Sequence, residues 1–124
     1  MKIEIPLLTR PKKNSQKIWY NPRTKKTMIV QSDTYMQFER DCAYFMPKLK
    51  EPIDRPVNLK CTFYVPDRKK RDLTNLENAI ADILVKYKVL KDDDYTIVTG
   101  WDGSKVIYEK GVEKTIIEIE ECII

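Results

Sequence analysis

Alternating hydrophobic and polar residues mark the strand candidates of this chain. Residues 2–8, 57–65 and 114–122 carry hydrophobic side chains at every second position, the spacing that places them on one face of a β-strand. Two shorter β-prone runs, residues 18–20 and 27–30, flank a turn-type segment at residues 21–24, which predicts a hairpin with a basic tip. Residues 96–101 and 105–109 are predicted as two further strands, joined by a hairpin turn at Asp102-Gly103.

Two other segments repeat their hydrophobic residues at helical spacing. The first starts near a candidate N-cap at Ser32 or Asp33, and its stripe consists of Tyr35, Phe38, Cys42, Phe45 and Met46. The second covers residues 72–88, and its stripe consists of Leu73, Leu76, Ile80, Ile83, Leu84 and Tyr87. Residues 47–56 contain three prolines and are predicted to be a connector. Two helices and several strands, with no repeat, predict one α+β domain over residues 1–124 with a mostly antiparallel sheet.

The absence of histidine narrows the chemistry that the chain can carry. Its 124 residues include no histidine, which excludes a Ser-His-Asp triad, a Cys-His pair and a His-ligated zinc site. Cys42, Cys61 and Cys122 form no C-x-x-C spacing, so we expect reduced thiols in a cytoplasmic protein. No hydrophobic run approaches the roughly 20 residues of a membrane span. Hydrolysis would therefore depend on carboxylates, on lysine, or on a metal held by oxygen ligands.

Charge is segregated along the chain, although the net charge is only +4. Residues 10–26 contain no acidic residue, and a second basic run occupies residues 68–71. Acidic residues gather at residues 92–94 and near the C-terminal end. Separate basic patches favour a polyanionic partner, and the alternative is a solvated basic surface.

Aspartates bracket the second predicted helix. Asp72 stands at its start, and Asp92, Asp93 and Asp94 follow its end. If the two flanking strands are neighbours, these carboxylates could converge at one end of the sheet. Converging carboxylates repel unless a cation or a proton lies between them, and hard oxygen ligands favour Mg²⁺ or Mn²⁺. The alternatives are a helix N-cap for Asp72 and a solvated acidic turn for the other three.

The helical wheel adds Asn75 and Asp82 to the arc of Asp72, opposite the hydrophobic stripe. Asp72 and Asp82 are about 15 Å apart along the helix axis, so they cannot both bind one ion. Asn75 is one turn from Asp72 and can serve the same site. The basic run that precedes Asp72 would hold a phosphate backbone beside the carboxylates.

The residues of this helix resemble the core signature of the RusA family of Holliday junction resolvases. Arg71-Asp72-Leu73-Thr74-Asn75-Leu76, the later Asp82-Ile83-Leu84, and Lys91-Asp92-Asp93 resemble a basic stretch that leads into D-L-D-N-L-x-K, followed by D-x-L and a D-D pair. Lys12-Lys13-Asn14-Ser15 resembles an early loop of phage-type members, and Asp102-Gly103-Ser104 resembles their late hairpin.

The resemblance implies a homodimeric, Mg²⁺-dependent endonuclease that nicks opposed strands of four-way DNA junctions in recombination, repair or phage DNA processing. It implies a RusA-like fold and a cytoplasmic location in a bacterial host, with a phage or prophage gene suspected. Mn²⁺ is a possible substitute for Mg²⁺. The implied metal ligands are Asp72, Asp92 and Asp93, with Asn75 and Thr74 in support; a shift of one residue would move the roles to Asp93 and Asp94. The implied DNA contacts are Lys12, Lys13, Asn14, Arg68, Lys69, Lys70 and Arg71.

Two positions depart from the family signature. Thr74 replaces its second aspartate and Asn78 replaces its lysine. A threonine hydroxyl supplies an oxygen without a charge, so one alternative is a weak or inactive module that binds junctions without cutting them. A second alternative is a protein-interaction domain whose basic loops meet an acidic partner.

Trp19 and Tyr20 form an aromatic pair beside Lys17. They are candidates for stacking on the unpaired bases of a junction. The alternative places one of them in the core and the other on the surface.

Overall fold

A five-stranded mixed sheet forms the body of the protein. The computed structural model describes residues 1–12, 16–31 and 33–122. The strands of this sheet are β1 (Lys2–Ile5), β4 (Val57–Val65), β5 (Val98–Gly100), β6 (Lys105–Tyr108) and β7 (Lys114–Glu121). Their order is β1-β7-β4-β5, and β6 also pairs with β4. The central pairs β1–β7 and β4–β7 are antiparallel, whereas β5 and β6 run parallel to β4. The predicted α+β class with a mostly antiparallel sheet is confirmed.

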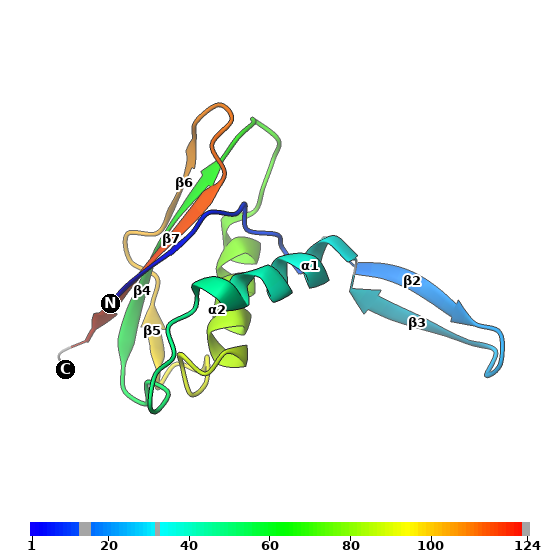
Figure 1. Ribbon diagram of the computed structural model, residues 1–124, viewed down its shortest axis with the longest axis horizontal. Helices are drawn as coiled ribbons and strands as arrows, with labels where there is room; N and C mark the ends of the chain where they lie inside the picture. Colours follow the sequence, from blue (N-terminus) through cyan, green and yellow to red (C-terminus); the bar gives the residue numbers. More distant parts are fainter. Residues whose placement is uncertain (13–15, 32, 123–124) are drawn as a thin grey trace.

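Two helices cover one face of this sheet (Figure 1). Helix α1 (Asp33–Cys42) continues into the short 3₁₀ helix η2 (Ala43–Phe45), and α2 (Leu73–Lys86) follows β4. Both helices start and end within a few residues of the limits that the hydrophobic spacing predicts. No helix among residues 1–12, 16–31 and 33–122 is long and apolar enough to cross a membrane.

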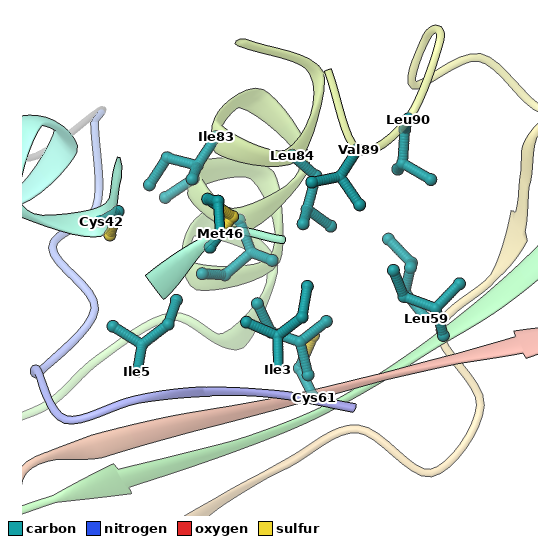
Figure 2. Close-up of a cluster of buried hydrophobic side chains, with 14 of the residues drawn as sticks. Ile3, Ile5, Cys42, Met46, Leu59, Cys61, Ile83, Leu84, Val89 and Leu90 are labelled. Carbon is teal, nitrogen blue, oxygen red and sulfur yellow. The ribbon is translucent and has the colours of Figure 1, made fainter. Parts of the chain in front are cut away.

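The core lies between these helices and the sheet, and Figure 2 shows its side chains. Strand β4 alternates buried and partly buried residues along its whole length, as expected for a strand with one covered face. Ile3 and Ile5 of β1 face the same core, which they share with Ile83 and Leu84 of α2. Phe45 departs from the predicted stripe of the first helix: it is exposed, because the chain turns into η2 and Met46 takes the buried position instead.

The three cysteines of the described residues are free. Burial raises the pKa of the Cys42 and Cys61 thiols to about 12, and nearby acidic side chains add to the shift. These two thiols therefore stay protonated at neutral pH and act as small core residues.

The predicted hairpin between residues 96–101 and 105–109 is wrong. Strands β5 and β6 pair with successive segments of β4, at Val57–Asn58 and at Thr62–Val65, so they form one interrupted edge. The Ser104 hydroxyl fills the gap, since it accepts from the Cys61 amide and donates to the Leu59 carbonyl. The Asn58 side chain meanwhile bonds both the amide and the carbonyl of Asp102. Ser104 thus satisfies the backbone of β4 where the edge is interrupted, and Asn58 of β4 satisfies the backbone of the connecting turn at Asp102.

The second sheet is the hairpin of β2 (Gln16–Asn21) and β3 (Lys26–Gln31), as predicted. It forms a separate two-stranded sheet and extends away from the helices and the main sheet (Figure 1). Trp19 and Tyr20 are about half exposed, at 46% and 55%. The alternative that placed one of them in the core is therefore wrong.

Candidate active site

The start of α2 positions Asp72. The Asp72 carboxylate accepts a hydrogen bond of 3.0 Å from the Thr74 amide, which makes it the N-cap of the helix. A cap of this kind satisfies one of the free amides of the first turn and places a negative charge where the helix dipole favours it. Asp72 is nevertheless exposed, and it lines a shallow hollow of about 620 Å³ with Lys70, Arg71, Leu73 and Asn75. It thus remains accessible to a ligand while it caps the helix.

A different set of carboxylates gathers at the other end of α2, where Asp82 lies in the helix and Asp92 and Asp93 follow it. Asp82, Asp92 and Asp93 form what we call the acidic cluster. Burial, a contact with the Asp92 carboxyl, and the negative charges of Asp82 and Asp92 all raise the pKa of Asp93. The Asp93 amide also donates to the Asp92 carboxylate, at 2.7 Å. The cluster thus holds like charges close together, an arrangement that a divalent cation would relieve.

Asp94 stabilises the turn next to this cluster. Its carboxylate accepts hydrogen bonds from the Thr96 amide and the Thr96 hydroxyl, and these bonds lower the pKa of Asp94. Its carbonyl accepts from the amides of Ile97 and Val98. Because Asp94 is committed to this turn, the unshifted assignment to Asp92 and Asp93 fits the structure better than the assignment shifted by one residue.

Asp72 and the acidic cluster lie at opposite ends of α2. The helix has 14 residues, so its ends are about 21 Å apart at 1.5 Å per residue. Strands β4 and β5 are neighbours, as the convergence hypothesis required, but they are parallel. In such a unit the helix starts at the carboxyl end of the first strand and ends near the amino end of the second. Convergence of Asp72 with Asp92 and Asp93 is therefore wrong for a single chain.

No metal-binding group of three or more acidic or cysteine residues is present within residues 1–12, 16–31 and 33–122. Two carboxylates of the acidic cluster still have the hard oxygen donors that Mg²⁺ prefers. The carboxylate oxygens of Asp92 and Asp93 fit a divalent cation. The described residues of one chain do not supply a complete set of ligands for it.

Some of the basic residues predicted to contact DNA already have partners within the protein, whereas others are exposed and accessible to DNA. The Arg71 guanidinium is mostly buried and pairs with Asp67 at 2.7 Å, which lowers the pKa of that carboxyl. Arg68 lies over the ring of Tyr108, 4.9 Å from its centroid. Lys69 and Lys70 are exposed, and neither has an ion pair within the described part of the chain. Sequence reasoning missed the partners Asp67 and Tyr108, although an acid four residues before Arg71 is visible in the sequence.

Lys12 brings the N-terminal loop against the acidic cluster. Its ammonium group lies 3.7 Å from the Asp82 carboxylate, and both side chains are partly exposed. Lys12 is thus a neighbour of the carboxylates, a position that no spacing in the sequence reveals. Lys13 and Asn14, also predicted to contact DNA, lie outside the described residues.

The sequence model described as "Endodeoxyribonuclease RusA" matches residues 9–120 of the 124, nearly the whole chain. The chain belongs to the RusA endodeoxyribonuclease family. The match spans the Asp72 cap, the acidic cluster and the β2–β3 hairpin. A search of curated proteins finds no match.

Membership in the RusA family implies a nuclease that binds branched DNA and acts on Holliday junctions. The segregation of charge agrees with this function, because exposed Lys69 and Lys70 lie directly before the helix that separates the two groups of aspartates.

Proposed function

We propose that this protein is a metal-dependent endodeoxyribonuclease that resolves four-way DNA junctions by paired nicking as a homodimer, in recombination, repair or phage DNA processing. The observation that carries the proposal is the acidic cluster, in which burial first, and then the neighbouring Asp92 and Asp82 carboxylates, raise the pKa of Asp93. Membership in the RusA family supplies the substrate class. Mg²⁺ is the expected cation, with Mn²⁺ as a substitute.

The residues of the chain divide the work of phosphodiester hydrolysis. A bound divalent cation neutralises charge on the phosphate and lowers the pKa of water. Asp92 and Asp93 would hold that cation, with Asp82 behind them. Lys69 and Lys70 would bind the phosphate backbone near the start of α2 and fix the position of the strand. Asn75 and Thr74 would support Asp72 at the same end of the helix.

A homodimer would bring the two carboxylate groups together. In a two-fold dimer the same patch contacts itself, so the start of α2 in one protomer can meet the acidic cluster of its partner, and the reverse contact follows by symmetry. We therefore propose that each site combines Asp72 of one protomer with Asp92 and Asp93 of the other. The distance of about 21 Å between the helix ends supports this arrangement over a site within one chain. Two such sites would nick two strands.

Junction cleavage tests the proposed function. Labelled four-way junctions and linear duplexes of equal length are incubated with the protein in Mg²⁺, in Mn²⁺, and in excess chelator. We expect paired nicks in the junction with either metal, little cutting of the duplex, and none in chelator. Intact junctions in both metals would contradict the proposal.

A second candidate is a junction-binding module with weak or no catalysis. It is favoured by Thr74, an exposed neutral residue where the family signature has a carboxylate. This candidate predicts binding to junctions that weakens with salt, without cleavage in either metal. The same cleavage assay, run beside a binding assay, separates the two functions.

A further inference from the structure

The β2–β3 hairpin exposes hydrophobic side chains on both of its faces. Trp19 pairs with Met28 across the hairpin, and the two side chains are 46% and 48% exposed. Ile18 and Tyr20, on the other face, are 75% and 55% exposed. A two-stranded hairpin by itself is marginally stable in water. Exposed aromatic and aliphatic residues on such an element indicate a surface that a partner covers.

The charge of the hairpin selects the class of partner. Residues 16–31 contain four cations, Lys17, Arg23, Lys25 and Lys26, and no acidic residue. The last three are exposed at or beside the turn. Two such hairpins from two copies of the chain would repel one another, whereas a polyanion would be attracted. Charge complementarity therefore favours DNA over a second copy as the occupant.

The register of the hairpin places an aromatic ring and a cation on one face. Met28 lies opposite Trp19, and Lys26 lies two residues from Met28 along the same strand. Residues two apart on a strand share a face and are about 7 Å apart. The turn is fixed by a hydrogen bond from the Arg23 amide to the Asn21 side chain, and Lys25 adopts a left-handed conformation with φ of 55°. The cations of the turn are thus presented by a defined loop at the end of the arm.

We infer that the β2–β3 hairpin is a DNA-binding arm that recognises the branch point of a junction. Arg23, Lys25 and Lys26 contact phosphates, and Trp19 and Tyr20 stack on bases at the branch, where the continuous base stack of a duplex is interrupted. Stacking suits this role because any base offers an aromatic face, whereas a fully paired duplex offers none along its length. This inference rests on the proposed function for its substrate, and it adds the element that distinguishes branched from linear DNA.

Binding assays in chelator test the arm without cleavage. The probes are a four-way junction with 2-aminopurine at the branch and a linear duplex of equal length. A variant with both Trp19→Ala and Tyr20→Ala is expected to bind the junction about tenfold or more weakly, from the usual value of base stacking. Its duplex affinity stays near that of the wild type, and the change in 2-aminopurine fluorescence is lost. Trp19→Phe retains most of the junction affinity.

Two further variants separate stacking from charge. Replacing Arg23, Lys25 and Lys26 by Gln weakens binding to both DNAs. It also reduces the steepness of the plot of log association constant against log salt concentration by about 2–3, since each phosphate contact contributes about 0.9 to that slope. Tyr44→Ala is the matched control, because Tyr44 is 86% exposed and lies on η2 rather than on the hairpin. We expect this control to bind both DNAs as the wild type does.

The outcomes distinguish failure of the arm from failure of the proposed function. Hairpin variants that bind the junction with unchanged affinity and unchanged fluorescence would contradict the DNA-binding role of the hairpin. If the wild type still cleaves junctions in Mg²⁺, that result would leave the proposed nuclease function supported. Variants that dissociate a dimer without affecting DNA binding also overturn it, and identify a second copy as the occupant. Loss of junction binding in the hairpin variants, with a wild type that never cleaves, supports the arm and contradicts the nuclease.

Discussion

The two ends of α2 hold aspartates in opposite electrostatic situations. At the start of the helix, Asp72 accepts a hydrogen bond from the Thr74 amide and sits where the helix dipole favours a negative charge. Beyond the other end, burial and then the nearby Asp92 and Asp82 carboxylates raise the pKa of Asp93. Asp72 therefore stabilises the folded state, whereas ionised Asp93 destabilises it. A carboxylate that the fold disfavours is the stronger indication of a cation site.

The largest expected effect is loss of cleavage in Asp93→Asn. Removing a carboxylate that we propose to bind the cation should lower the rate of junction cleavage by about 100-fold or more, an effect comparable to loss of one group that stabilises transition-state charge. Thermal unfolding should show an equal or higher melting temperature. The sign follows from the raised pKa: the ionised form is disfavoured in the folded state at neutral pH, and asparagine carries no charge. Cleavage at the wild-type rate would refute the role of Asp93.

Substitutions of Asp72 separate its two roles. Asp72→Asn keeps a good N-cap, so the melting temperature should stay near that of the wild type while cleavage falls about tenfold or more. Asp72→Ala loses the cap as well and should cost about 1 kcal/mol of unfolding free energy. Cleavage kinetics and denaturant unfolding of both variants give the comparison. If Asp72→Asn cleaves as fast as the wild type, Asp72 is a structural cap only.

Thr74→Asp restores the carboxylate of the family signature. Because Thr74 is exposed in the first turn of α2, the new charge is also favoured by the helix dipole. We expect junction cleavage about tenfold faster than that of the wild type, with unchanged or slightly raised stability, by the usual size of a single charge-stabilising contact. An unchanged cleavage rate would show that a second carboxylate at this end does not limit catalysis. Thr74→Asn controls for the change of side-chain shape without charge.

The smallest expected effect is that of Asp94→Asn, the neighbour of Asp93 that is bound to Thr96. An asparagine carbonyl can still accept from the Thr96 amide, so the turn should persist. We expect a cleavage rate within about threefold of the wild type, a much smaller change than in Asp93→Asn, since the altered hydrogen bonds contribute less than about 1 kcal/mol. A loss as large as that of Asp93→Asn would move the catalytic role one residue along the chain.

The sequence predicts the elements of this fold better than their connections. Hydrophobic spacing places β4 at Val57–Val65 and finds both helices, because burial on one face imposes a period on the residues. It misses the pairing of β5 and β6, because Asp102-Gly103 is a local turn signal, whereas the hydrogen bonds of Asn58 and Ser104 join residues more than 40 positions apart.

The site shows the same division between local and long-range information. The N-cap of Asp72 follows from the residues beside it and was among the alternatives for that residue. The nearness of Asp82 to Asp93 and of Lys12 to Asp82 depends on how loops fold back onto α2, which no spacing encodes. Parallel pairing of β4 with β5, rather than simple adjacency, decides that Asp72 and Asp93 lie apart.

Complementation between two impaired variants tests most directly whether each site is built from two protomers. Asp72→Asn and Asp93→Asn homodimers are prepared separately, then mixed so that subunits exchange, and nicking of a labelled junction is measured. If Asp72 of one protomer serves the acidic cluster of its partner, the heterodimer has one intact site and one doubly altered site. We predict that the mixture regains single-strand nicking without paired resolution. A mixture no more active than its two components, with exchange shown by mass after one variant is labelled with ¹⁵N, would contradict the shared site.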